Sequence, residues 1–139
     1  MGNYFCRVFY EDTDSAGIVY YANYLKFIER ARTETLREIG VIQSKIRKKY
    51  NLIFVVKNIF AEFIKPAKLD DLLEIKTNFI KLGMVSVEIE HEIFIKNDII
   101  FKAKVKLGLV DINGKIKKLP QDLQGKLEKL TNSSVKIPN

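Results

Sequence analysis

One long amphipathic segment, followed by a change in the spacing of hydrophobic residues, constrains the fold of this chain more than any other feature. Between about Ala22 and Gly40 the apolar positions recur every three or four residues, as in a helix that buries one face. These positions are Tyr24, Leu25, Ile28, Ala31, Thr35, Leu36 and Ile39. Asn23 is a candidate N-cap, Gly40 is placed to end the helix, and Phe27 lies on the otherwise polar side. We therefore expect one long helix that is covered by more than one surface.

After a short basic helical segment at residues 44–50, the spacing of the apolar residues changes to two, which is typical of β-strands. Four strands are predicted, at residues 52–64, 73–79, 85–96 and 99–109, and residues 3–9 predict a shorter strand before the long helix. Consecutive strands with short connections pair antiparallel, and a lone amphipathic helix can bury its stripe against one face of the sheet. The sequence thus predicts an α+β fold, with an antiparallel sheet of about five strands wrapped around one long central helix.

Proline, glycine and asparagine residues between these elements support the strand boundaries. Pro66 ends the first long strand, and turns are predicted at Leu82-Gly83-Met84, Asn97-Asp98 and Asn113-Gly114. Pro120 opens a final short helical stretch, and residues 131–139 are read as a polar tail. The strand at 52–64 is apolar on both faces, which is typical of a strand that is central in a sheet or lies in a subunit interface.

The length and composition predict one ordinary globular domain. We expect a single domain over residues 1–139, with its core at about 4–112 and a helical tail at 120–139. No apolar run reaches the ~18 residues that span a bilayer, and no secretory signal is recognised, so no transmembrane segment and a cytoplasmic location are expected. With one cysteine, one histidine and no cluster with metal-ligand spacing, neither a disulfide nor a metal site is predicted.

The formal net charge of +7 favours an anionic partner, such as a phosphate-bearing small molecule, an acidic protein, an anionic membrane surface or nucleic acid. No nucleic-acid-binding motif and no platform of stacking aromatic residues are recognised, so nucleic acid is not the expected partner. Lysines at 102, 104 and 106 line one strand face, and most of them are interpreted as solvated.

An acidic loop lies directly before the long helix. It places Glu11, Asp12 and Asp14 within four residues, followed by a small Ser15-Ala16-Gly17 turn. A carboxylate beside a helix N-terminus can attack or take a proton, while the free N–H groups of the first turn hold a developing oxyanion. The simpler interpretation is that the loop caps the helix electrostatically, for about 0.3–1 kcal/mol. Spacing alone favours the simpler interpretation, because clustered carboxylates also occur for structural reasons.

The loop and helix together resemble a known family. The run Y-E-D-T-D-S-A-G-I-V-Y-Y-A-N-Y-L-K-F-I-E-R-A-R-T-E, at residues 10–34, is similar to the signature of the 4-hydroxybenzoyl-CoA thioesterase family, and in particular to its Tol–Pal-associated (YbgC-type) branch. The run F-V-V-K-N-I-F-A-E-F-I-K-P-A-K-L-D-D-L-L, at 54–73, is similar to a segment of the same branch. The resemblance covers about residues 4–112 and implies the hot-dog fold.

The resemblance also implies an activity and its residues. The activity is hydrolysis of an acyl-CoA thioester without a cofactor, by a homodimer or homotetramer, with an acyl carrier protein or cell-envelope proteins as candidate partners. Asp14 matches the catalytic carboxylate, Tyr10 matches a recurrent tyrosine, and the backbone N–H near Tyr21 matches the group that polarises the thioester carbonyl. Many members of the Tol–Pal-associated branch carry histidine where this chain has Tyr21, which leaves Asp14 as the principal chemical group.

Other titratable residues are assigned structural roles. His91 lies on the apolar face of a predicted strand and is expected to be a core or interface residue, and Cys6 is expected to be a buried small hydrophobe. A hot-dog protein that binds acyl-CoA or acyl carrier protein with little turnover is the alternative function. An intact Asp14 beside a helix N-terminus disfavours it, because a binding protein has no need of a carboxylate aimed at the thioester.

Overall fold

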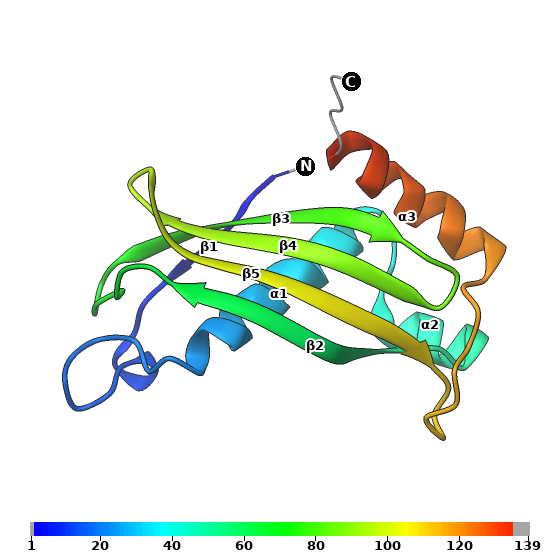
Figure 1. The fold of residues 1–139 in the computed structure, drawn as a ribbon, viewed down its shortest axis with the longest axis horizontal. Coiled ribbons are helices and arrows are strands. Elements are labelled where there is room, and N and C mark those ends of the chain that lie inside the picture. The colour runs from blue at the N-terminus through cyan, green and yellow to red at the C-terminus, as the bar shows by residue number, and fades with distance from the viewer. Residues whose placement is uncertain (1, 135–139) are drawn as a thin grey trace.

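The computed structural model describes residues 2–134, and a five-stranded antiparallel sheet curves around one long helix, α1 (Asn23–Glu38) (Figure 1). The strands are β1 (Tyr4–Arg7), β2 (Ile53–Phe63), β3 (Leu72–Leu82), β4 (Ser86–Ile95) and β5 (Asp98–Val110), in the spatial order β1-β3-β4-β5-β2. The remaining elements are the short 3₁₀-helix η1 (Tyr10–Asp12) and the helices α2 (Gln43–Tyr50) and α3 (Gln121–Ser134). The predicted α+β class and its central helix are confirmed.

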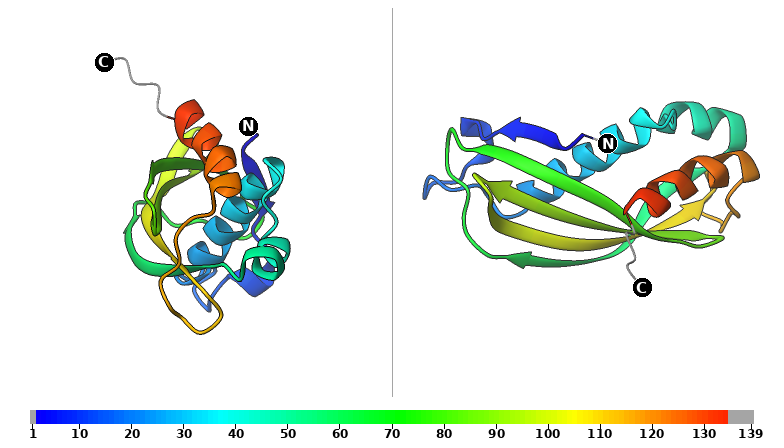
Figure 2. Two further views of the ribbon diagram at one scale, coloured as in Figure 1. Left: turned by 90° about the vertical axis from the view of Figure 1, so that its right-hand side faces the viewer. Right: turned by 90° about the horizontal axis from the view of Figure 1, so that it is seen from above.

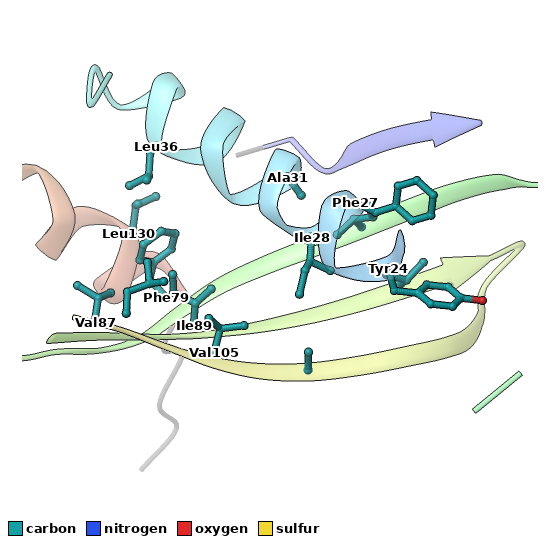
Figure 3. Close-up of a cluster of buried hydrophobic side chains, with 14 of the residues drawn as sticks. Tyr24, Phe27, Ile28, Ala31, Leu36, Phe79, Val87, Ile89, Val105 and Leu130 are labelled. Carbon is teal, nitrogen blue, oxygen red and sulfur yellow. The ribbon is translucent and has the colours of Figure 1, made fainter. Parts of the chain in front are cut away.

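Helix α1 crosses the concave face of the sheet, and its buried stripe forms the centre of the core (Figures 2 and 3). Its apolar side chains pack with Phe79 of β3, Ile89 of β4 and Val105 of β5. The predicted stripe was wrong at two positions, since Phe27 is 2% exposed and Leu25 is 39% exposed. Phe27 lies three residues from Tyr24 and one from Ile28, so it falls within the same face, whereas Leu25 lies at its margin. No second covering surface is needed to explain Phe27.

The two ends of α1 differ in how well the sequence predicted them. Asn23 is the first helical residue and not the N-cap, which is Ala22, and the Asn23 side chain bonds elsewhere in the acidic loop. The predicted end at Gly40 is confirmed. Gly40 has φ of +81°, its N–H donates to the Arg37 carbonyl at 3.0 Å, and the Val41 N–H donates to the Leu36 carbonyl at 2.9 Å. These two bonds form a Schellman motif, which favours glycine at the left-handed position.

Strand β2 is an edge strand that, among the described strands, pairs only with β5. Of the two positions that its apolar faces predicted, the sheet centre was therefore wrong, and the subunit interface stays a prediction. Five apolar residues of β2 are more than a third exposed, as is Ile64 directly after the strand. The five are Val55, Val56, Ile59, Phe60 and Phe63. The alternation along β3 and β4 was predicted correctly, because Leu73, Ile75 and Phe79 of β3 are buried beside the inward-facing residues of β4. The inner face of the sheet is therefore buried against α1, whereas the long outer edge of β2 is exposed.

The convex face of the sheet pairs charges of opposite sign. In the β4–β5 register, Glu88, Glu90 and Glu92 lie opposite Lys106, Lys104 and Lys102. Opposite charges facing each other across antiparallel strands are favourable. The lysine-rich face predicted on β5 is therefore balanced by glutamates of the neighbouring strand.

The turns and the C-terminal helix differ from the predictions in detail. The β4–β5 turn consists of Lys96 and Asn97, with φ of 48° and 72°, one residue earlier than predicted, and two positive φ values are typical of a tight hairpin turn. Helix α3 begins directly after Pro120, as predicted, and continues to Ser134 through part of the predicted polar tail. Its residues Leu123, Leu127 and Leu130 are buried against the core. Residues 135–139 of that tail lie outside the described residues. None of the helices described is both long and apolar enough to cross a bilayer.

Candidate active site

The acidic loop is bound directly to the start of α1. The Asp12 carbonyl accepts a hydrogen bond from the Tyr20 N–H at 3.0 Å and a second from the Asn23 side-chain amide at 2.9 Å. The Asp12 carboxylate accepts the Phe9 N–H at 2.8 Å, which closes the turn of η1. Asp12 therefore positions the loop, and its carboxylate is already occupied by a backbone donor.

Asp14 lies at the start of a tight turn and organises that turn with its own side chain. Its Oδ1 accepts the Ala16 N–H at 2.8 Å, and its backbone N–H donates to the Ile18 carbonyl at 2.9 Å. Gly17, with φ of +81°, completes the turn in a conformation that favours glycine. The residue is exposed, and among the described residues no donor contacts its second oxygen, Oδ2. One carboxylate oxygen is thus held by the backbone while the other is available.

The N-terminus of α1 offers unpaired backbone donors. Within residues 2–134, the N–H groups of Tyr21 and Ala22 donate no hydrogen bond to the protein. The Tyr21 carbonyl, by contrast, is paired, since it accepts the Tyr24 N–H at 3.4 Å in the first turn of the helix. Unpaired N–H groups at a helix N-terminus carry a partial positive charge and favour an anion nearby. They are suited to hold an oxygen on which negative charge develops.

An aromatic cluster, which the sequence did not reveal, borders this helix start. The Tyr21 ring meets Phe63 edge-on with centroids 6.2 Å apart, and Tyr24 stacks on Phe101 at 5.0 Å with an interplanar angle of 9°. Phe63, from the end of β2, also contacts Tyr24 and Phe101. Tyr21 is 63% exposed and Phe63 is 52% exposed. The tyrosines at 20, 21 and 24 were the available signal, but their partners come from strands far along the chain.

Tyr10, the third predicted site residue, lies on η1 and is 81% exposed. Its carbonyl accepts the Thr13 N–H at 3.0 Å and the Thr13 hydroxyl at 2.8 Å. Its side chain lines a shallow groove with Phe9 and Leu69. Among the described residues, no hydrogen bond or ring contact joins Tyr10 to Asp14 or Tyr21. The structure therefore places Asp14 and Tyr21 on the loop that enters α1, and Tyr10 at the side of that loop.

Comparison with known proteins matches this architecture to a family. The sequence pattern described as "Thioesterase superfamily" matches residues 16–102, more than half of the chain. The chain belongs to the thioesterase superfamily. The matched residues begin two positions after Asp14, so the match covers Tyr21 and α1 but not Asp14 or Tyr10.

Curated relatives support the same assignment for this thioesterase. It is 41% identical to the "Acyl-CoA thioesterase YbgC" of Haemophilus influenzae over 111 residues, which cover 80% of this chain and 81% of the relative. It is 38% identical to the "Acyl-CoA thioester hydrolase YbgC" of Escherichia coli O157:H7, covering 84% and 88% of the two chains. The predicted resemblance to the YbgC type and the predicted thioester hydrolase activity are therefore confirmed at the level of the family.

Solved structures confirm the fold of the thioesterase. A probable thioesterase from Bartonella henselae superposes with a TM-score of 0.82 at 36% identity, covering 85% of this chain and 98% of that chain. A hypothetical protein from Aquifex aeolicus superposes with a TM-score of 0.85 at 33% identity, covering 91% and 99%.

His91 is buried in the thioesterase core, far from solvent, as predicted. It is 0% exposed, its Nε2 lies 3.1 Å from a guanidinium nitrogen of Arg32 on α1, and its Nδ1 lies 3.1 Å from the Thr77 hydroxyl on β3. A guanidinium only donates, so Nε2 accepts and Nδ1–H donates to Thr77. Burial, followed by the charge of Arg32, lowers the pKa of His91 to about 3. The ring is neutral at physiological pH and joins the helix to the sheet.

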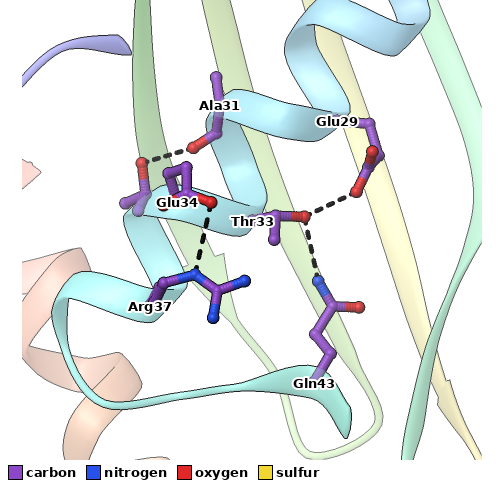
Figure 4. A network of polar contacts seen from close by, with 7 residues as sticks. Glu29, Ala31, Thr33, Glu34, Arg37 and Gln43 are labelled. Carbon is purple, nitrogen blue, oxygen red and sulfur yellow. Dashed lines mark hydrogen bonds and ion pairs between the residues drawn. The ribbon is translucent and has the colours of Figure 1, made fainter.

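Cys6 and Glu29 also serve structure. Cys6 is half-buried against the core, and burial raises the pKa of its thiol to about 11, so a reactive thiolate is not formed at neutral pH. Glu29 lies on the exposed face of α1 and accepts the Thr33 hydroxyl at 2.6 Å, while Gln43 of α2 donates to that hydroxyl at 3.2 Å (Figure 4). Within residues 2–134, no group of three histidine, cysteine, aspartate or glutamate side chains is placed to hold a metal ion.

Proposed function

We propose that this thioesterase hydrolyses acyl-coenzyme A to a free acid and coenzyme A, with Asp14 as the reacting carboxylate. The observation that carries the proposal is the position of Asp14. Its carboxylate is held through one oxygen by the Ala16 N–H, on the loop that Asp12 binds to the start of α1, where the Tyr21 N–H is unpaired. The substrate class follows from the YbgC relatives, which are described as acyl-CoA thioesterases.

Two chemical routes use the same arrangement. In the first, the free Oδ2 of Asp14 attacks the thioester carbon, the C–S bond breaks, the thiolate leaves, and water hydrolyses the resulting anhydride. In the second, Asp14 takes a proton from a water molecule that attacks the same carbon. In both routes the thioester oxygen becomes anionic, and the Tyr21 N–H at the helix N-terminus is the donor that we assign to stabilise it. Tyr10 is assigned to the rim of the site.

A second copy of the chain is expected to complete the site. Asp14 is exposed, and both Tyr21 and Phe63 are more than half exposed, so a single chain leaves the reacting groups in water. Phe63 is the last residue of β2, which pairs only with β5 among the strands described. The other edge of this strand therefore has unpaired backbone groups, and several of its apolar side chains are exposed. Native proteins cover such edges. We propose that the 139 residues form one domain, and that two copies associate through β2 as a homodimer or as half of a homotetramer.

The experiment that tests the function is thiol release from acyl-CoAs of graded chain length and from an aromatic acyl-CoA. It compares the native protein, Asp14→Asn and the control Glu11→Gln. Asparagine keeps the oxygen that accepts the Ala16 N–H, so the turn should persist while the reactive oxygen is lost. Glu11→Gln removes the same charge from an exposed side chain of the same loop. We expect kcat/KM to fall about 100-fold or more in Asp14→Asn and to stay near native in the control.

Three results would count against the proposal or refine it. Equal rates for the native protein and Asp14→Asn would remove Asp14 from the chemistry. No hydrolysis of any acyl-CoA or acyl-carrier-protein thioester, with tight binding of the intact thioester, would favour the non-catalytic binding module. Labelled oxygen in Asp14 after a single turnover in ¹⁸O-labelled water would establish the first route, because only hydrolysis of an anhydride at the Asp14 carboxyl carbon places it in that side chain.

A further inference from the structure

The positive charge of this chain is concentrated in two short segments. Helix α2 (Gln43–Tyr50) and the loop at 111–118 together contain seven cations and one carboxylate, which amounts to +6 of the net charge of +7. The cations are Lys45, Arg47, Lys48, Lys49, Lys115, Lys117 and Lys118. The other residues of the chain are therefore nearly balanced in charge. This surface, called the basic end below, accounts for the basic character of the protein.

The two segments form one surface. The Asn51 side chain, directly after α2, accepts the Ile112 N–H at 3.1 Å, and Ile112 lines a shallow groove with Lys45, Arg47 and Lys48. Both segments lie at the same end of the molecule (Figure 1). The loop is held in shape by Asp111, whose carboxylate accepts the N–H groups of Asn113 and Lys115 at 2.8 and 3.0 Å.

The cations of the basic end are available to a partner. All four cations of α2 are exposed, as are Lys115 and Lys118. Among the described residues, ion pairs join Arg37 to Glu34 and Lys65 to Asp98, and neither involves the basic end. The one carboxylate of these segments, Asp111, is occupied by the backbone of its own turn. Asp122 of α3 also lies at this end, where it accepts the Tyr50 hydroxyl at 3.0 Å, but within the described part of the chain it forms no ion pair with these cations. The cations therefore outnumber the carboxylates at this end, and the positive field is only partly offset.

Two aliphatic side chains project from the same loop. Ile112 is 51% exposed and lines the groove with Lys45 and Lys48. Ile116 is 73% exposed and lies between Lys115 and Lys117. Six of the seven cations are lysines, which act as hydrated point charges, whereas arginine is favoured where one phosphate is bound through a fork of donors. Dispersed lysines can bind many negative charges on a broad surface, and the protruding isoleucines can enter an apolar layer beneath those charges. This is the pattern of peripheral binding to anionic lipid.

We propose that the basic end binds the surface of a bilayer that contains anionic phospholipid, with Ile112 and Ile116 entering the headgroup region. The acidic loop with Glu11, Asp12 and Asp14 lies at the opposite end of the long axis (Figures 1 and 2). A negative surface attracts the basic end, so the bound molecule holds its Asp14 loop on the side away from the lipid. The proposal does not depend on the substrate of the thioesterase.

The test is co-sedimentation of the full-length protein with vesicles of phosphatidylcholine, alone or mixed with phosphatidylglycerol, at physiological salt. We expect binding only to the anionic vesicles, weakening as salt is raised. The triple variant Lys48→Gln, Lys115→Gln, Lys118→Gln should bind about 100-fold more weakly, since each lysine near such a surface contributes about a factor of five. Ile116→Ser should weaken binding by about tenfold without changing the charge.

The control is Lys96→Gln, Lys102→Gln, Lys104→Gln, which removes three exposed lysines from β5 and the turn before it. Its binding should change by no more than about threefold, because screening confines the attraction to about 8 Å. The proposal is overturned if anionic vesicles fail to sediment the protein, or if both triple variants lose binding equally. Binding to an acidic protein, such as an acyl carrier protein, with none to vesicles would also overturn it, in favour of a protein partner.

Discussion

The phenol oxygen of Tyr24 accepts a hydrogen bond of 3.0 Å from the backbone N–H of Ala67. Tyr24 lies in the first turn of α1, and Ala67 lies in the connection between β2 and β3, directly after Pro66. The carbonyl of Ala67 accepts the Val19 N–H at 2.9 Å. One buried residue, Ala67, therefore joins the helix, the sheet connection and the loop that carries Asp14.

Tyr24→Phe should destabilise the protein, because it leaves the N–H of the fully buried Ala67 without an acceptor. Such an unsatisfied donor costs about 1–3 kcal/mol, measured as the change in free energy of unfolding by urea denaturation. Tyr20→Phe is the matched control, since Tyr20 is 45% exposed and its hydroxyl contacts no described partner. An equal loss in both variants would show that the Ala67 contact is unimportant.

His91 should make the stability of the protein depend on pH. Its pKa is lowered from 6.5 to about 3 in the folded chain, so below pH 6.5 the unfolded chain binds a proton that the folded chain does not. The free energy of unfolding should therefore fall as pH falls from about 6.5 towards 3, by roughly 2 kcal/mol between pH 6.5 and 5. Because carboxylates also titrate in this range, the measurement is the difference between native protein and His91→Gln. Parallel pH profiles would contradict the assignment.

Gly17→Ala should impair the turn of Asp14, since an alanine at φ of +81° is strained by about 1 kcal/mol. We expect kcat/KM to fall while the melting temperature falls by only a few degrees, which is the shift that about 1 kcal/mol produces in a domain of this size. A variant that keeps native kinetics would show that the turn tolerates a different shape.

Gly125→Ala should raise the stability. Gly125 lies within α3, and a Cβ at this position would meet nothing within 4 Å. Alanine is favoured over glycine in a helix interior by about 0.5–1 kcal/mol. Calorimetry should show a higher melting temperature with unchanged hydrolysis, and a lower one would place α3 under a constraint that the glycine relieves.

The double variant Val56→Lys, Phe60→Lys should shift the protein towards a monomer in light scattering and reduce hydrolysis with it. Both residues are exposed on the edge strand β2 and, in the proposed dimer, would place charges at the contact. Met84→Lys, at an exposed turn away from β2, is the control and should leave the assembly unchanged. A monomeric native protein with full activity would contradict the dimer.

Local signals predicted much of the fold. The end of α1 followed from Gly40, and the inward faces of β3 and β4 followed from alternation, since both depend on residues close in sequence. The place of β2 at the edge could not be predicted, because strand order depends on distant pairings such as Tyr4 with Ile75. A strand with two apolar faces is equally suited to a sheet centre or to an exposed contact, so only the structure decides between them.

The candidate site divides in the same way. Asp14, Gly17 and the helix start are adjacent in sequence, so their pattern pointed to the loop. The aromatic border formed by Tyr21, Phe63 and Phe101 was not predictable, because β2 and β5 bring the two phenylalanines there from separate parts of the chain. The Arg32–His91 contact was hidden for the same reason.

The attachment of the acidic loop has a consequence for biosynthesis. The loop is held by Ala67, which accepts the Val19 N–H, and by Ile75, which pairs with Tyr4. Both Ala67 and Ile75 are translated long after the loop itself. Strand β3, which contains Ile75, in turn depends on β4 and β5 for its place in the sheet. Contacts so distant in sequence form late, because the intervening chain must first be closed into a loop. On the ribosome, the N-terminal segment that carries Asp14 therefore emerges first and acquires its shape last. If Asp14 is the reacting group that we propose, a growing chain acquires its activity only after nearly all of the sheet has left the exit tunnel.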